Sequence, residues 1–186
     1  MTRLLSLLAV MALLAYPLLV YFGLHHLPLT WLAMALGLVL VVRALLLPSG
    51  QRRQGLPVLI AGLLLLLLCG WRQEPQWLLW YPVAVNLSLL LTFATSLRWP
   101  PTTIERLAQL RDPQLPAEAR PYLRRLTIIW CLFFMVNGTI ATATVISDDM
   151  TLWALYNGLI AYLLIGTLVV GEWLYRHVVL QQRGGA

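Results

Sequence analysis

The sequence predicts an all-α polytopic membrane protein with six transmembrane helices. Two features of composition lead to this prediction: 60% of the 186 residues are hydrophobic and only 11% are charged, and the mean hydropathy is +0.79. A soluble domain carries charge on about a quarter of its residues, so a water-soluble globule is excluded. The third feature is the placement of the arginines, which lie between apolar stretches and predict the topology.

Six apolar stretches approach the roughly 20 residues that a transmembrane helix needs. The first continues without a polar cleavage region, so we interpret it as a retained helix and not as a signal peptide. The third is short and must stand nearly upright or thin the bilayer locally. In chain order the predicted spans are Leu4 to Phe22, Leu29 to Leu47, Leu56 to Trp71, Trp77 to Leu97, Leu126 to Ile146 and Thr151 to Tyr175.

The positive charges predict that both the N-terminus and the C-terminus are cytoplasmic, because short arginine-rich loops stay on that side. All 13 basic residues are arginines, and this topology leaves only Arg72 on the outer side. The net charge of +6 therefore marks cytoplasmic loops, and no nucleic-acid partner is predicted. The outer loops also contain Glu74, Asp148, Asp149 and the adjacent pair His25 and His26.

We expect a single integral membrane domain over residues 1–186. Four leucine-rich spans occupy 1–97, a cytoplasmic basic loop occupies 98–125, and the paired C-terminal spans and tail occupy 126–186. The first three spans are mostly leucine, alanine and valine, which suits a lipid-facing wall. The last three spans are therefore the candidate core.

The basic loop is predicted to contain a short amphipathic helix between the fourth and fifth spans. Thr102 and Glu105 fit a capping box, in which each side chain accepts a hydrogen bond from a backbone N–H group at the helix start. Asp112 and Pro113 then end the helix. We expect it to lie on the inner leaflet, because apolar residues recur at helical spacing at Ile104, Leu107 and Leu110.

Two roles for this basic loop are open at the level of sequence. Clusters of arginine beside a span bind acidic lipid headgroups, and this is the simpler interpretation. The alternative is a docking surface for a cytosolic partner. The candidate docking residues are Arg106, Arg111, Arg120, Arg124 and Arg125.

Polar residues within the spans gather in the second half of the chain, and each must find a partner inside the bundle. Residues 137–141 (Asn-Gly-Thr-Ile-Ala) and 157–161 (Asn-Gly-Leu-Ile-Ala) agree at four of five positions. Glycine and asparagine at such sites favour close helix packing, and a ligand pocket is the alternative. The candidate polar core consists of Asn86, Asn137, Tyr156, Asn157 and Glu172.

Glu172 is the only acid within a predicted span, and it lies one turn before Arg176. Antiparallel packing is expected to bring it near Arg124 and Arg125, so an ion pair that fixes the helix ends is the first interpretation. A proton-coupling carboxylate is the second.

The sequence indicates no catalytic, cofactor-binding or metal-binding residues. Cys69 and Cys131 lie in apolar runs, where thiols behave as small hydrophobic groups. His25 and His26 are too few for a metal site, which needs three or four ligands in a defined geometry. No phosphate-binding loop or dinucleotide motif is present, so an enzyme is not favoured.

Several groups of residues from Arg98 onward carry a family resemblance. They are Arg98-Trp99-Pro100-Pro101, Ile104-Glu105-Arg106-Leu107-Ala108, Tyr122-Leu123-Arg124-Arg125, Trp130-Cys131, Phe133-Phe134, Asn137-Gly138, Trp153 to Tyr162 and Gly171-Glu172-Trp173-Leu174. Together they resemble a family of small uncharacterised bacterial inner-membrane proteins encoded in aryl-polyene-like clusters with acyl carrier protein and ketosynthase genes. The paired C-terminal helices are also faintly similar to intracellular septation protein A.

The resemblance implies a multi-pass protein of the bacterial inner membrane. The leading hypothesis is a non-enzymatic protein that assists assembly, anchoring or hand-off of a lipid-linked aryl-polyene-like product, with an acyl carrier protein or another cytosolic biosynthetic enzyme as partner. A small transporter or flippase for a lipid or hydrophobic metabolite is the alternative, and it predicts a cavity lined by Asn86, Asn137, Tyr156 and Asn157. A membrane enzyme acting on acyl chains, with Glu172 or Tyr156 as acid–base group, is a third possibility.

Overall fold

The computed structural model describes residues 16–46, 52–72 and 74–180, and the regular structure in these ranges is helical, with no β-strand. A 3-10 turn, η2 (Ala117–Ala119), precedes α8, and the π turns η3 (Tyr156–Ile160) and η4 (Arg176–Leu180) follow α9 and α10. The α-helices are α2 (Tyr16–His26), α3 (Leu29–Leu46), α4 (Arg52–Arg72), α5 (Gln76–Leu79), α6 (Tyr81–Arg98), α7 (Thr103–Arg111), α8 (Arg120–Ile146), α9 (Met150–Leu155) and α10 (Ala161–Tyr175).

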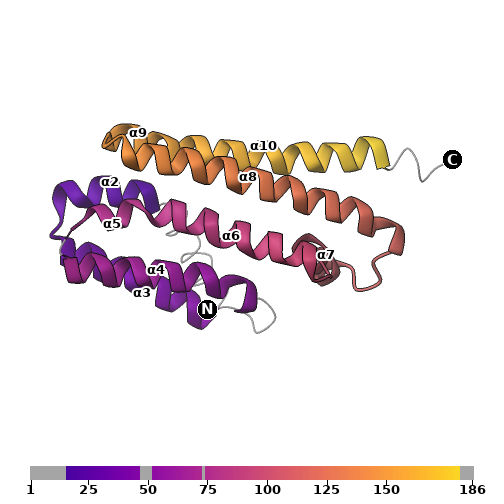
Figure 1. Cartoon of the computed structure of the whole chain (residues 1–186), viewed down its shortest axis with the longest axis horizontal. Helices are drawn as coiled ribbons and strands as arrows, with labels where there is room; N and C mark the ends of the chain where they lie inside the picture. Colours follow the sequence, from indigo (N-terminus) through magenta and orange to yellow (C-terminus); the bar gives the residue numbers. More distant parts are fainter. Residues whose placement is uncertain (1–15, 47–51, 73, 181–186) are drawn as a thin grey trace.

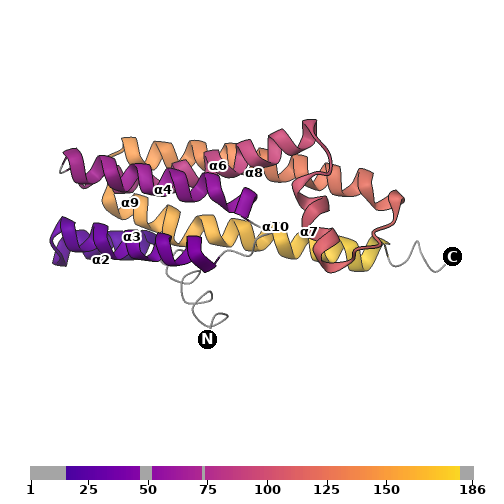
Figure 2. The same ribbon diagram turned by 90° about the horizontal axis from the view of Figure 1, so that it is seen from below.

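The long helices form a bundle of two layers whose axes follow the longest dimension of the molecule (Figure 1). One layer contains α4, α6 and α8, and the other contains α3, α2 and the α9–α10 segment (Figure 2). Within the first layer α6 is central, because it packs against both α4 and α8. In the second layer α2 contacts α3, α9 and η3. The helices α6 and α8, which contain most of the predicted fourth and fifth spans, therefore lie side by side.

Three helical segments in the described part of the chain are long and apolar enough to cross a membrane: Gln76–Arg98, Ala117–Ile146 and Met150–Val178. They correspond to the predicted fourth, fifth and sixth spans, and the shorter apolar helix Leu56–Arg72 corresponds to the third. Large apolar side chains are exposed along all of the long helices, as expected of a surface that faces lipid. The structure therefore supports a helical membrane protein.

The first two predicted spans are described in part. Residues 4–15 of the first lie outside the described residues, and its end forms part of α2. The second predicted span coincides with α3, which ends at Leu46. The fourth is interrupted, because α5 ends at Leu79 and α6 begins at Tyr81 with a proline in its first turn.

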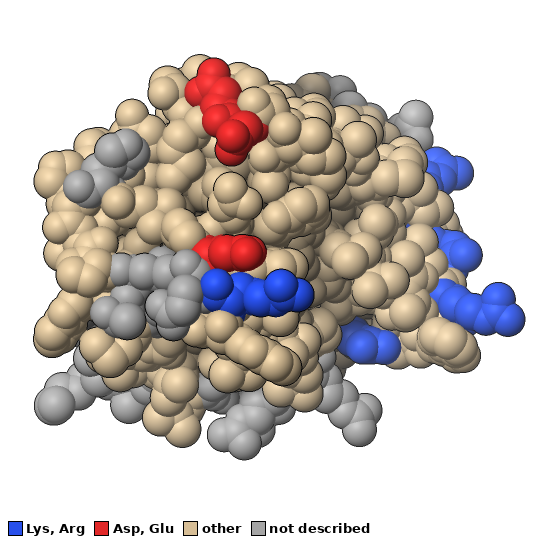
Figure 3. Space-filling view, turned by 60° about the vertical axis from the view of Figure 1, so that its left-hand side comes forward, with Lys and Arg blue, Asp and Glu red and all other residues tan. Residues whose placement is uncertain are grey.

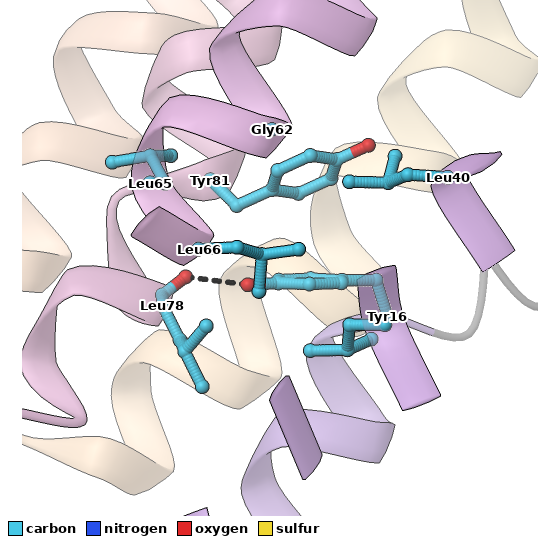
Figure 4. Close-up of a pocket in the computed structure, with 8 residues that line it drawn as sticks. Tyr16, Leu40, Gly62, Leu65, Leu66, Leu78 and Tyr81 are labelled. Carbon is cyan, nitrogen blue, oxygen red and sulfur yellow. Dashed lines mark hydrogen bonds between the residues drawn. The ribbon is translucent and has the colours of Figure 1, made fainter. Parts of the chain in front are cut away.

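A buried aromatic cluster holds this interruption in place. Pro82 has no N–H group to donate to the carbonyl of Leu78 four residues earlier. Tyr16 instead donates its hydroxyl to that oxygen at 2.7 Å (Figure 4), and its ring centroid lies 4.2 Å from that of Tyr81. Nε1 of Trp153 donates to the carbonyl of Leu79 at 3.0 Å. The space left among the residues of Figure 4 is about 10 Å³, so it is no larger than a single water site.

The capping box predicted at the start of the loop helix is confirmed. The side chain of Thr102 accepts from the backbone N–H of Glu105, and the side chain of Glu105 accepts from that of Thr102, each at 3.3 Å. The helix ends at Arg111, before Asp112, as predicted. Asp149 caps α9 in a similar way and accepts from the backbone of Thr151 at 2.9 Å.

Charge is distributed unevenly between the two ends of the bundle. The end at which α9 and α5 begin carries Asp148, Asp149 and Glu74 together with Arg72. Figure 3 brings this end forward and shows its acidic side chains in red. Further arginines, in blue, lie along the right-hand side of the same view. The opposite end holds α7 and the start of α8, and its arginines include Arg98, Arg106, Arg120, Arg124, Arg125 and Arg176. This asymmetry is the pattern expected of a protein with one cytoplasmic face.

Candidate functional site: buried amides beside an apolar cavity

Asn86 of α6 and Asn137 of α8 form a buried pair at the contact between these helices. Nδ2 of Asn137 donates to Oδ1 of Asn86 at 3.0 Å, and Nδ2 of Asn86 donates to the carbonyl of Pro82 at 2.8 Å. The next residue, Gly138, permits this approach, since a Cβ atom there would lie 3.1 Å from Cβ of Asn86. A small residue beside a hydrogen-bonding residue is a common way to hold two helices together inside a membrane.

Tyr156 extends this pair to a third segment of the chain. Its hydroxyl donates to Oδ1 of Asn137 at 2.8 Å, so Asn137 connects α6, α8 and η3. Asn157 is also buried although it is the next residue. It lies four residues from both Trp153 and Ala161, which are buried as well, and residues at this spacing share one face of a helix.

Asn157 makes a second link between α8 and η3. Its Nδ2 donates to Oγ1 of Thr144 at 3.1 Å and to the carbonyl of Trp153 at 3.0 Å. A carbonyl can only accept, which fixes the orientation of the amide. Among the described residues every fully buried side-chain nitrogen or oxygen has a hydrogen-bond partner, whereas no donor to Oδ1 of Asn157 is present there. That oxygen is therefore not fully buried and retains its capacity to accept a hydrogen bond.

A cavity of about 360 Å³ lies between the two helix layers, where α2 begins. Its walls come from α2, α4, α6, α8 and the η3–α10 segment, and they are mainly apolar and aromatic. No charged side chain lines it among the described residues. Characteristic lining residues are Tyr16, Val58, Phe133, Phe134, Tyr162 and Ile165.

Three of the four residues predicted to surround a cavity do line it, namely Asn86, Asn137 and Asn157. Tyr156 does not, because its hydroxyl is directed to Asn137 within the helix contact. The amides thus serve in packing and also form one wall of a pocket, so the two interpretations of the sequence are compatible. Their partners in the wall, Phe134 and Tyr162, were named for the family resemblance but not as site residues, because the sequence does not show which way an aromatic residue inside an apolar span points.

Glu172 lies apart from this cavity, near the arginine-rich end. Its Oε1 accepts from the hydroxyl of Tyr122 at 3.0 Å and lies 3.6 Å from Nε of Arg176. The ion pair is therefore made within one segment, and Tyr122 provides the link to α8 that Arg124 and Arg125 were expected to provide. Arg124 instead donates to the carbonyl of Leu97 at 2.8 Å.

The five arginines proposed as a docking surface are not equivalent. Nε of Arg120 lies 3.4 Å from Oε1 of Glu105, and Arg124 is used to hold the end of α6. Arg125 is exposed and Arg106 is half-buried. The side chain of Arg111 lies outside the described residues.

The site contains groups for hydrogen bonding and for apolar contact. In the described part of the chain no three His, Cys, Asp or Glu side chains are grouped to hold a metal ion. Cys69 is buried and Cys131 half-buried, both as free thiols. Comparison with family models, with curated proteins and with solved structures gives no match for this chain. The arrangement is suited to holding an uncharged, largely apolar molecule.

Proposed function

We propose that this chain is a six-span protein of the bacterial inner membrane that holds the apolar chain of a lipid-linked, aryl-polyene-like product during its assembly or hand-off. The observation that carries the proposal is the cavity of about 360 Å³ between the helix layers. Its size falls within the range of small-molecule sites, which are mostly apolar with a few placed polar groups.

The walls favour a conjugated or aromatic chain over a charged group. Phe133, Phe134 and Tyr162 line the cavity, and aromatic side chains pack well against a planar apolar ligand. A charged group of the ligand would be costly to bury without an oppositely charged partner, and no described lining residue supplies such a partner. Oδ1 of Asn157 offers one acceptor for a hydroxyl or amide donor on the ligand.

The arginine-rich end of the bundle supports an acyl carrier protein as the cytosolic partner. Acyl carrier proteins are acidic, and a basic surface steers an acidic partner toward it. Arg125 is the best candidate for this contact, because it is exposed, whereas Arg120 and Arg124 already have partners in the protein.

A small transporter or flippase is the second candidate. It is favoured by the π turn at Tyr156–Ile160, because such turns are frequent at functional sites. A transporter requires the cavity to open alternately to both sides of the membrane, whereas hand-off requires one opening. An enzyme is less favoured, because neither acid–base candidate, Tyr156 or Glu172, lines the cavity among the described residues.

Photolabelling tests the cavity as a binding site. The probe is a long-chain fatty alcohol with a diazirine in mid-chain, added to the full-length protein in nanodiscs. We expect label on Phe133 or Tyr162, reduced by excess cis-parinaric acid, a conjugated polyene. Ile165→Trp should occupy part of the cavity and lower this label by about fivefold, because the ligand chain can no longer lie along the apolar lining.

Leu164→Trp is the matched control, because Leu164 is the preceding residue but is exposed on the bundle surface. It should leave the label unchanged. Equal labelling in the two variants, or label only at lipid-exposed positions, would contradict the proposed site.

The proposed topology is tested by single cysteines in a chain that lacks Cys69 and Cys131. Leu27→Cys and Gln76→Cys are expected to react with a membrane-impermeant maleimide in intact cells, because both positions are exposed at the end that the arginines assign to the outside. Glu118→Cys, exposed at the opposite end, should react only after permeabilisation. Reaction of Leu27→Cys only after permeabilisation would refute this topology.

A further inference from the structure

α7 contacts the bundle through the polar residues of its first turn. The backbone N–H of Thr103 donates to Oγ of Ser96 in α6 at 2.9 Å. Glu105 is buried and pairs with Arg120 at 3.4 Å. Thr102 is buried as the helix cap. An amphipathic helix usually packs on a protein through its apolar side chains, whereas these contacts of α7 are polar.

The later apolar residues of α7 are more exposed. Leu107 is 43% exposed and Leu110 is 64% exposed. They are three residues apart and so share one face of the helix, whereas Ile104 in the first turn is half-buried. Trp99, which precedes α7, is 63% exposed. We name these three exposed side chains, Leu107, Leu110 and Trp99, the α7 face.

Basic side chains accompany the α7 face. The guanidinium of Arg98 lies 5.9 Å from the centroid of the Trp99 ring. Arg106 is half-buried on α7, and Arg125 is exposed on α8. The acids of the same loop are Glu105, which is paired with Arg120, and the exposed Asp112 and Glu118.

The surroundings favour a lipid surface over a protein as the occupant of this face. α7 packs against α6 and α8, and the exposed apolar residues of these helices, such as Leu91 and Ile128, form part of the proposed lipid-facing surface. α7 is therefore attached to helices whose exposed apolar side chains are proposed to face lipid, and the basic side chains beside it complement anionic headgroups. Leucines that enter the headgroup layer, a tryptophan at its edge and flanking arginines are the features of an interfacial helix on an anionic leaflet.

We propose that the α7 face is an interfacial anchor that inserts Leu107, Leu110 and Trp99 into the anionic inner leaflet, while the buried Thr102–Glu105 cap fixes the helix to the bundle. The anchor holds the start of α8 at the level of the headgroups. It does not depend on what the cavity binds.

The test uses the full chain without its two native cysteines, in nanodiscs, with an environment-sensitive fluorophore on Leu110→Cys. In phosphatidylglycerol nanodiscs we expect quenching by a lipid that is spin-labelled near its headgroup. Quenching by iodide in water should be at least about threefold weaker than for the same label on the exposed Glu118→Cys, since an inserted helix face is shielded from water.

Arg98→Gln together with Arg106→Gln should reduce this protection in phosphatidylglycerol, because the anionic headgroups lose their basic partners. The matched control is Arg72→Gln at the opposite end of the bundle, which should leave it unchanged. Iodide quenching of Leu110→Cys equal to that of Glu118→Cys would overturn the proposal. So would protection that appears only when an acyl carrier protein is added, since the face would then bind a protein.

Discussion

Leucine in place of Gly138 is expected to lower the free energy of unfolding by about 3 kcal/mol, at the upper end of the cost of overpacking. A single methyl group at this position would already lie 3.1 Å from Cβ of Asn86, which is attached to the backbone of α6 and cannot rotate away. A leucine would force α8 away from α6 and stretch the hydrogen bond of 3.0 Å between Asn137 and Asn86.

The measurement is equilibrium unfolding in mixed detergent and dodecyl sulfate micelles, followed by circular dichroism. Gly166→Leu in α10 is the matched control, since a Cβ atom there meets nothing within 4 Å. Leucine is also the better helix former by somewhat less than about 1 kcal/mol, so the control should be neutral or slightly stabilising. Coincident unfolding curves for both variants would show that close approach at Gly138 is not required.

Asn137→Leu is expected to destabilise the protein by about 2 kcal/mol, because two buried groups lose their partners at once. The hydroxyl of Tyr156 loses its acceptor, and Oδ1 of Asn86 loses its donor. Leucine has the same branching at Cγ and the same number of side-chain heavy atoms as asparagine, so the change removes the hydrogen bonds and keeps the shape of the side chain.

Thr139→Val is the control for this variant, because Thr139 is exposed and its hydroxyl donates within its own helix, to the carbonyl of Met135. Its cost should stay below about 0.5 kcal/mol, as for an ordinary surface change. A double-mutant cycle with Asn86→Leu should yield a coupling of roughly 1 kcal/mol, within the range for hydrogen bonds between membrane helices. Strict additivity of the two single variants would mean that the pair contributes nothing to stability.

Local features were the most predictable part of this protein. The Thr102–Glu105 capping box and the end of α7 before Asp112 depend on contacts within four residues, so the sequence contains all the necessary information. The interruption near Trp80 was not predicted. It is stabilised by Tyr16, which lies 62 residues away in the chain and donates its hydroxyl to the carbonyl of Leu78.

The candidate site was predictable in its polar members and not in its geometry. Asn86, Asn137 and Asn157 are conspicuous as amides within apolar spans, and each needs a partner. Which partner each amide finds depends on how the helices are rotated about their axes and on which distant helix they meet. The repeated Asn-Gly pattern illustrates this, because Gly138 faces Asn86 in α6 whereas Gly158 faces Leu18 in α2.

The sequence by itself determined the helical class, the apolar length of the three long helices and the separation of charge between the two ends. These follow from composition and spacing, because exposing polar groups to the hydrocarbon core is costly and only long apolar helices avoid that cost. Only the tertiary structure decided that Asn137 joins three segments, that Glu172 bonds to Tyr122, and that α7 leaves its leucines exposed. Each of these depends on which faces of distant helices meet, and in a chain so rich in leucine many faces are alike in hydropathy and differ only in how they pack.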